Sequence, residues 1–210
     1  MFMTYKELLE KHPIISEQIE KDELLIILKE LERILSLDFE GDICEFGCFV
    51  GTTSLFIQRL LQVSSSKKKL YLYDSFEGLP EKMSQDQSAA GADFIPGELM
   101  ASKSQLKLNF KKANLPIPKI KKAWFSDLKE KDLPKQICFA FLDGDFYKSV
   151  LDPLSLIEDR LTSGGIVIVD DYNNPALPGT KKAVDEFLRL NQSFTLLKVS
   201  QSLAIIHCLR

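Results

Sequence analysis

Ile137-Cys-Phe-Ala-Phe-Leu-Asp-Gly-Asp145 joins six apolar residues to two aspartates, and Gly164-Gly-Ile-Val-Ile-Val-Asp-Asp171 repeats this arrangement further along the chain. An unbroken apolar run of this length is typical of a strand that is buried on both faces. The first run is followed by apolar residues at helical spacing over 150–161. Strands that alternate with helices in this way indicate a parallel sheet with helices on both faces.

The same rhythm extends in both directions from these two runs. We predict helical residues over 4–40 and near 52–61, 103–112, 150–161 and 183–188, and strands at 43–46, 70–73, 120–125, 137–142, 166–169, 194–199 and 203–208. Only Ser200-Gln201 and Ser202 separate the last two strands, which is too short for a helical crossover, so they form an antiparallel hairpin. The fold class is therefore α/β, with a Rossmann-like, seven-stranded, mostly parallel sheet.

The chain length favours one domain with a helical N-terminal extension. The 210 residues lie close to the usual size of a single domain. We expect residues 1–40 to form a helical segment that packs on a core domain of residues 41–210. The apolar stripe of this segment fits two roles, a homodimer contact or a cover for the sheet. Residues 75–102 form a long predicted loop, which is typical of a lid over a binding site.

Composition excludes several classes of partner. The formal net charge of −3 argues against nucleic acid, whose binding domains are usually basic. The strongest apolar runs have about six residues, whereas a membrane helix needs about 20. The N-terminus has no apolar signal region, and the four cysteines form no C-x-x-C pair. We therefore expect a cytoplasmic protein with reduced thiols.

Polar residues that follow the strands mark the candidate site, because ligands of open parallel sheets bind outside the carboxyl ends of the strands. After the first strand comes a Gly-x-x-x-Gly turn formed by Gly47 and Gly51. Phe49 stands where a dinucleotide-binding loop has its middle glycine, which argues against a dinucleotide. Asp74 follows the second strand, where a carboxylate can accept a hydrogen bond from a ribose hydroxyl.

Four aspartates follow the two strands quoted at the outset. Asp143 and Asp145 follow one strand, and Asp170 and Asp171 follow the other. Carboxylates that meet at adjacent strand ends raise one another's pKa and cost stability, and a cation relieves this cost. Oxygen ligands favour Mg²⁺ or another hard divalent ion. A glycine turn, a ribose-binding acid and a metal cluster together indicate a nucleoside-containing cofactor beside a divalent cation.

Six segments resemble the macrocin O-methyltransferase family, whose members methylate sugar hydroxyls in antibiotic biosynthesis. They cover about residues 41–190 in order and comprise Gly41-Asp-Ile-Cys-Glu-Phe-Gly-Cys-Phe-Val-Gly51, Leu72-Tyr-Asp-Ser-Phe-Glu-Gly-Leu-Pro80, Phe94-Ile-Pro-Gly-Glu-Leu99, Leu142-Asp-Gly-Asp-Phe-Tyr147, Gly164-Gly-Ile-Val-Ile-Val-Asp-Asp-Tyr172 and Gly179-Thr-Lys-Lys-Ala-Val-Asp-Glu-Phe187. The first 40 residues carry no matching motif, and elements that contact the substrate are expected there.

The resemblance implies an S-adenosylmethionine-dependent O-methyltransferase that acts on a small-molecule hydroxyl acceptor. It implies Asp145 as the general base and a metal site for Mg²⁺ or another hard divalent ion, formed by Asp143, Asp170 and Asp171. The implied cofactor-binding residues are Glu45, Phe46, Gly47, Gly51, Thr52, Thr53, Asp74, Ser75, Phe76, Trp124, Asp127 and Asp143. The family often has threonine near Asp127, so the sequence departs from the family pattern beside the expected adenine.

Three other functions stay open at this point. A catechol-type, Mg²⁺-dependent O-methyltransferase would use the same metal chemistry on a different acceptor. A non-catalytic protein that binds S-adenosylmethionine would not need all four aspartates. An NAD enzyme is disfavoured by Phe49 and by the antiparallel C-terminal hairpin.

Overall fold

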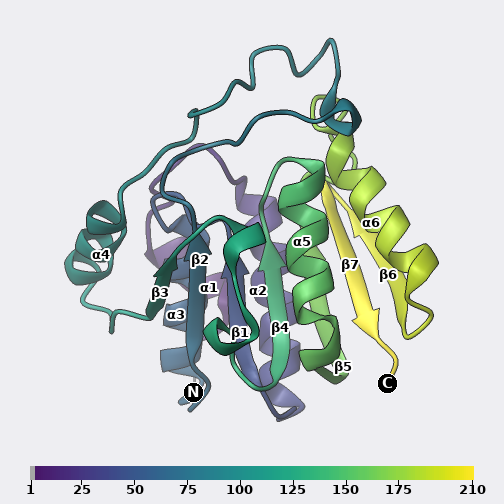
Figure 1. Ribbon diagram of the computed structural model, residues 1–210. Helices are drawn as coiled ribbons and strands as arrows, with labels where there is room; N and C mark the ends of the chain where they lie inside the picture. The colour runs from purple at the N-terminus through teal and green to yellow at the C-terminus, as the bar shows by residue number, and fades with distance from the viewer. Residues whose placement is uncertain (1–2) are drawn as a thin grey trace.

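A computed structural model describes residues 3–210 as one seven-stranded sheet with helices on both faces (Figure 1). The strand order is β3-β2-β1-β4-β5-β7-β6. The strands are β1 (Asp42–Phe46), β2 (Leu70–Asp74), β3 (Lys119–Lys122), β4 (Ile137–Leu142), β5 (Leu161–Val169), β6 (Phe194–Ser200) and β7 (Leu203–Cys208). The first five are parallel, whereas β7 runs antiparallel to both β5 and β6. The predicted fold class and C-terminal hairpin are confirmed.

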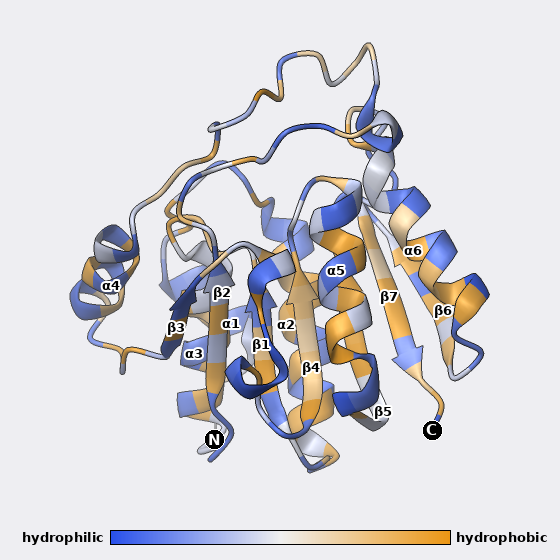
Figure 2. Cartoon of the chain, viewed as in Figure 1, coloured by the Kyte–Doolittle hydropathy of each residue, from blue (hydrophilic) through white to orange (hydrophobic). Residues whose placement is uncertain are grey.

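The helices form two layers, one on each face of this sheet. They are α1 (Tyr5–Lys11), α2 (Lys21–Ser36), α3 (Thr52–Val63), α4 (Lys103–Lys112), α5 (Tyr147–Ile157) and α6 (Pro178–Leu190). Phe139 and Phe141 of β4 point toward α1–α3, and Ala140 and Leu142 point toward α5 and α6, as the period of two in a strand requires. Figure 2 shows apolar strands between helices that carry polar outer faces.

The N-terminal segment differs from the single helical region that was predicted. It forms α1 and α2, which are separated by the non-helical residues 12–20. Pro13 explains the break, because the residue before a proline is sterically disfavoured in the helical region. In α2, Leu24, Ile27 and Leu28 are fully buried and belong to the core that also includes β4 and β5. The apolar stripe therefore covers the sheet.

Two other predicted boundaries are wrong. β3 ends at Lys122, so Trp124 and Phe125 lie beyond the strand, in and before a short 3-10 turn. Helix α5 ends at Ile157, and Leu161 is the first residue of β5 rather than the last of the helix. Both errors concern the ends of a strand or helix. At these ends the regular spacing of apolar residues continues although the backbone conformation changes.

Residues 75–102, which we call the arch, cross above the carboxyl ends of the strands between α6 and α4 (Figure 1). Asp86 ties the arch to α5, because its buried carboxylate accepts a hydrogen bond of 2.7 Å from the Tyr147 backbone N–H. The Ser88 hydroxyl donates to the Pro175 carbonyl at 2.8 Å, and Lys182 of α6 donates to the Gln85 carbonyl at 2.6 Å. The arch is thus fastened at its middle.

Candidate functional site

A cavity of about 760 Å³ lies beneath the arch at the carboxyl ends of the strands. It spans the point where the chain reverses the direction of strand addition, since β1 lies between β2 and β4. Ligands of open α/β sheets bind at such a point. Residues after β1, β2 and β3 line one half of the cavity, which we call the cofactor half. Residues after β4 and β5 and residues of the turn before β7 line the other, which we call the acceptor half.

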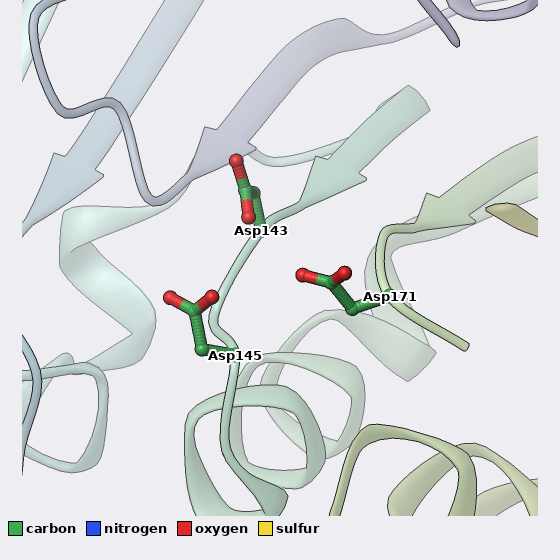
Figure 3. Close-up of side chains that lie close together, drawn as sticks. All are labelled: Asp143, Asp145 and Asp171. Carbon is green, nitrogen blue, oxygen red and sulfur yellow. The ribbon is translucent and has the colours of Figure 1, made fainter. Parts of the chain in front are cut away.

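Three predicted aspartates meet between the two halves. Oxygen atoms of Asp143, Asp145 and Asp171 all lie within 4.8 Å of one another, and Figure 3 shows their side chains converging. Burial raises the pKa of Asp143, and the neighbouring charges of Asp170, Asp145 and Asp171 raise it further. Burial also raises the pKa of Asp145 to about 7, with added effects from Asp171 and Asp74. The cluster is therefore unfavourable for three ionised carboxylates.

Asp170 lies outside this cluster, unlike the predicted metal set. Its Oδ1 accepts hydrogen bonds from the Ser202 hydroxyl at 2.9 Å and from the Asp171 backbone N–H at 2.8 Å. Burial raises the pKa of Asp170 to about 8, with added effects from Asp171 and Glu23. The structure thus groups Asp145 with Asp143 and Asp171, and gives Asp170 protein partners instead.

The residues of the cluster fit a hard divalent cation. They offer only carboxylate oxygens, which Mg²⁺ and similar ions prefer. Among residues 3–210, no group donates a hydrogen bond to the carboxylate of Asp143 or of Asp145. Lys148 is the one basic residue among those described that line the cavity, and its ammonium pairs with Asp152 at 2.5 Å. A cation would supply the missing positive charge.

The cofactor half is built from two loops that Asp74 holds together. Its Oδ2 accepts the backbone N–H groups of Cys48 at 2.7 Å and Phe49 at 3.0 Å, and its Oδ1 accepts that of Phe76 at 2.7 Å. Gly47 has φ +86°, and a Cβ atom there would lie 1.8 Å from the Asp143 carbonyl oxygen. Only glycine allows the loops after β1 and β4 to approach this closely.

These hydrogen bonds limit what Asp74 can offer to a ligand. A carboxylate has about four lone-pair positions, and backbone N–H groups already occupy three of them. The free position belongs to Oδ1, so Asp74 can accept one further hydrogen bond without losing a backbone partner. Ser75, Phe49, Trp124 and Phe125 line the same half and offer a hydroxyl and aromatic surfaces.

Several residues predicted to bind the cofactor do not line the cavity. Glu45 is buried and its carboxylate accepts a 2.6 Å hydrogen bond from Ser54 of α3, which ties strand to helix. The Phe46 ring stacks on Tyr73 in the core, with 4.6 Å between centroids. The other residues that the structure places outside the lining are Gly51, Thr52, Thr53, Phe76 and Asp127. Gly47, Asp74, Ser75, Trp124 and Asp143 do line it.

The N-terminal segment contributes residues that no motif identified. Glu17, Glu20 and Glu23 line the cavity, and we call them the glutamate rim. They recur every third residue before and within the first turn of α2. This spacing is visible in the sequence, but glutamates at a helix start are also expected from the helix dipole alone. Only the tertiary position of α2 shows that they face a cavity.

No helix among residues 3–210 combines the length and apolar character of a membrane-spanning segment.

Curated proteins resemble this chain in sequence. A protein of Streptomyces olivaceus, 8-demethyl-8-(2,3-dimethoxy-alpha-L-rhamnosyl)-tetracenomycin-C 4'-O-methyltransferase, is 29% identical over 164 residues, which are 75% of this chain and 61% of that protein. The chain spans 61–64% of the length of the curated relatives that it matches.

Solved structures share the fold. The O-methyltransferase NovP superposes with a TM-score of 0.76 and 24% identity, covering 89% of this chain and 79% of NovP. The apo structure of CalS11, a TDP-rhamnose 3'-O-methyltransferase, gives a TM-score of 0.60 and 20% identity, covering 97% and 91%. The sequence profile of the Macrocin-O-methyltransferase (TylF) family matches residues 17–201, which include strands β1–β6 and helices α2–α6. The chain therefore belongs to the macrocin-O-methyltransferase (TylF) family.

Proposed function

We propose that the protein transfers a methyl group from S-adenosylmethionine to a hydroxyl of a sugar or of a glycosylated small molecule. The observation that carries the proposal is the convergence of Asp143, Asp145 and Asp171 in one cavity with the two loops that Asp74 joins. Family membership supports the reaction type. The names of a similar protein, a rhamnosyl-tetracenomycin methyltransferase, and of a structural neighbour, a TDP-rhamnose methyltransferase, support a sugar hydroxyl as acceptor.

The cofactor half would hold S-adenosylmethionine through three features. The Oδ1 atom of Asp74 would accept one ribose hydroxyl, using its remaining lone pair. The absence of a side chain at Gly47 leaves backbone surface for the methionine part of the cofactor. Trp124 and Phe125 present aromatic surfaces beside the end of β2, where adenine would pack.

The acceptor would sit between the cofactor and Asp145. Asp143 and Asp171, with Asp145 beside them, would hold a divalent cation such as Mg²⁺. When bound, such an ion lowers the pKa of a hydroxyl that it contacts. The Asp145 carboxylate would take the hydroxyl proton as the new oxygen–carbon bond forms and the sulfur–carbon bond breaks. The products are the methyl ether, S-adenosylhomocysteine and protonated Asp145, so charge and atoms balance.

We also propose that this reaction takes place in the cytoplasm. All four cysteines are free and buried, which fits a reducing compartment.

A thermal-shift measurement with S-adenosylhomocysteine, with and without MgCl₂, tests the proposed function. A ligand at 100 times its dissociation constant adds about 2.7 kcal/mol to the free energy of unfolding. For a chain of this size the melting temperature should rise by roughly 5–11 °C. NADH serves as the comparison ligand. Stabilisation by NADH in place of S-adenosylhomocysteine would overturn the cofactor assignment.

The metal part of the proposal has its own control. MgCl₂ alone should stabilise the wild-type protein, and this increment should vanish in the Asp143→Asn/Asp171→Asn double variant. The same increment should persist in Asp152→Asn, whose carboxylate lines the cavity but pairs with Lys148. An equal Mg²⁺ response in all three proteins would show that the ion binds elsewhere.

A further inference from the structure

The surface at the β3 edge of the sheet carries a positive charge that the proposed function does not use. Residues 103–135 contain ten lysines, no arginine and three acidic residues, so this segment carries +7 while the whole chain carries −3. Its first part, residues 103–126, has seven of the lysines and no acidic residue. This part forms α4 and β3, at the opposite edge of the sheet from β6 (Figure 1).

The outer face of α4 carries three exposed lysines without acidic partners. They are Lys107, Lys111 and Lys112, which we call the lysine patch. No ion pair among residues 3–210 includes any of them. They surround Leu108, which is 43% exposed and lies on the side of α4 opposite to the buried Leu106. The helix therefore presents an apolar side chain within a group of unpaired positive charges.

Local structural rules explain only part of this composition. Lysines on an edge strand such as β3 prevent pairing with another sheet, and two of the β3 lysines form ion pairs with acidic residues. The helix dipole favours lysine in the last turn of α4 but acidic residues in its first turn. The first turn of α4 contains Lys103 and no acidic residue. The positive charge of α4 therefore has no complete explanation in the stability of the helix.

The residue types of this surface separate the classes of anionic partner. Protein interfaces are depleted in lysine and enriched in arginine and aromatic residues, and arginine is also preferred for nucleic-acid recognition. Residues 103–122 contain no arginine, and their exposed large apolar side chains are Leu108 and Ile117. Lysines around an apolar side chain on a helix are typical of binding to anionic lipid headgroups, which requires charge without fixed geometry.

We infer that the outer face of α4 binds to an anionic membrane surface. The lysine patch lies against the lipid headgroups, and Leu108 enters the boundary between the headgroups and the acyl chains. The inference goes beyond the proposed function and does not depend on it. The cytoplasmic leaflet of a membrane is anionic, so this binding fits the compartment proposed above. Binding of this kind requires no segment that spans the membrane.

The charge distribution of the chain also determines how the protein is oriented on the membrane. The whole chain carries −3 and residues 103–135 carry +7, so the remaining residues carry −10. An anionic surface attracts the lysine patch and repels the acidic remainder. Because α4 directly follows the arch, one end of the roof of the cavity lies beside the membrane in this orientation (Figure 1).

Co-sedimentation of the full chain with lipid vesicles tests the inference. One kind of vesicle contains equal parts of phosphatidylcholine and phosphatidylglycerol, and the other contains only phosphatidylcholine. We expect binding to the anionic vesicles at low salt and much weaker binding to the neutral ones. Salt at 1 M shortens the screening length to about 3 Å and should release most of the protein from the anionic vesicles.

Substitutions in α4 separate the contributions of charge and apolar contact. Lys107→Gln/Lys111→Gln/Lys112→Gln should lower the partition coefficient on anionic vesicles by about fivefold for each lysine. Leu108→Gln keeps the charge and a good helix former, and should also weaken binding because the apolar contact is lost. Leu108→Met restores an apolar side chain and should bind like the wild-type protein.

A second triple variant controls for the loss of net charge. Lys6→Gln/Lys21→Gln/Lys29→Gln removes three exposed lysines of α1 and α2, which form no ion pair among residues 3–210. Its binding to anionic vesicles should stay close to that of the wild-type protein. Melting temperatures show that each variant is folded before vesicles are added.

Four results would overturn the inference. They are equal binding to the two kinds of vesicle, equal loss of binding in the two triple variants, tighter binding to a short DNA duplex than to anionic vesicles at the same salt, and no binding to anionic vesicles. The third would assign the surface to nucleic acid, and the fourth is expected if the lysine patch contacts an acidic protein. Stabilisation by S-adenosylhomocysteine is measured without vesicles, so failure of the proposed function is recognised separately.

Discussion

The carboxylates in the two halves of the cavity differ in the hydrogen-bond donors that they contact. Asp74 in the cofactor half accepts three backbone N–H groups. Asp143 and Asp145, at the border of the acceptor half, accept none through their side chains, and burial raises the pKa of both. A carboxylate with backbone donors stabilises the loops that it joins. A buried carboxylate without donors lowers stability until a cation or a proton arrives, which points to a role in ligand binding.

The largest expected effect concerns turnover. Asp145→Asn keeps the size of the side chain and removes the proton acceptor, so methyl transfer should fall by about 10²–10⁴-fold. Release of S-adenosylhomocysteine in the presence of the acceptor measures the rate. Affinity for S-adenosylhomocysteine should stay within a few-fold of wild type, since Asp74 is intact. Loss of cofactor binding in a folded Asp145→Asn protein would contradict the role of Asp145 as base.

The next effect is on stability as a function of pH in the absence of divalent ions. The pKa values of Asp145 at about 7 and of Asp170 and Glu45 at about 8 lie above their ordinary values near 4. Between these limits the folded protein binds more protons than the unfolded chain. The free energy of unfolding should therefore fall as pH rises from about 4 to about 8.

Urea denaturation at pH 5 and pH 8 with a chelator measures this slope. Each proton bound only by the folded state changes the free energy of unfolding by about 1.4 kcal/mol per pH unit. The Asp145→Asn variant should show a shallower slope and gain stability relative to wild type at pH 8. A free energy of unfolding that rises with pH would show that the aspartates are not mutually destabilising.

The smallest expected effect is a change in the free energy of unfolding that has opposite signs for substitutions in the two halves. Asp74→Ala leaves the N–H groups of Cys48, Phe49 and Phe76 without their acceptor, and should lower the free energy of unfolding by about 1–3 kcal/mol. It should also weaken S-adenosylhomocysteine binding. At pH 8 without divalent ions, the Asp145→Asn variant should instead be more stable than wild type. If both substitutions destabilised the protein equally, the distinction between the halves would fail.

The centre of the sheet could be predicted because β4 and the second half of β5 are short apolar runs, which are typical of strands buried on both faces. β3 was harder, since its sequence Lys-Ile-Lys-Lys holds one apolar residue and lies at an edge. Local sterics at Pro13 predict the end of helix α1. Apolar residues at helical spacing on both sides of Pro13 nevertheless led to the prediction of one continuous helical region.

The site was predicted to the level of strand ends but not of side-chain direction. Asp170 and Asp171 are neighbours in sequence, but Asp171, whose backbone is left-handed at φ 57°, joins the cluster and Asp170 does not. The glutamate rim depends on how α2 packs on β4 and β5, a contact between segments more than 100 residues apart. Tertiary packing of this kind leaves no mark in local sequence spacing.

Backbone hydrogen bonds join the two ends of the arch to each other. The Leu79 N–H donates to the Glu98 carbonyl at 2.8 Å, and the Gly97 N–H donates to the Leu79 carbonyl at 2.9 Å. Residues 80–96 are therefore a loop with fixed ends, and doubling the length of such a loop costs only about 0.6 kcal/mol in closure entropy. Residues 89–96 of this loop lie beyond the anchors at Gln85, Asp86 and Ser88, so they can be lengthened while Asp74 and the cofactor loops keep their positions, which makes them the natural place to engineer acceptor range.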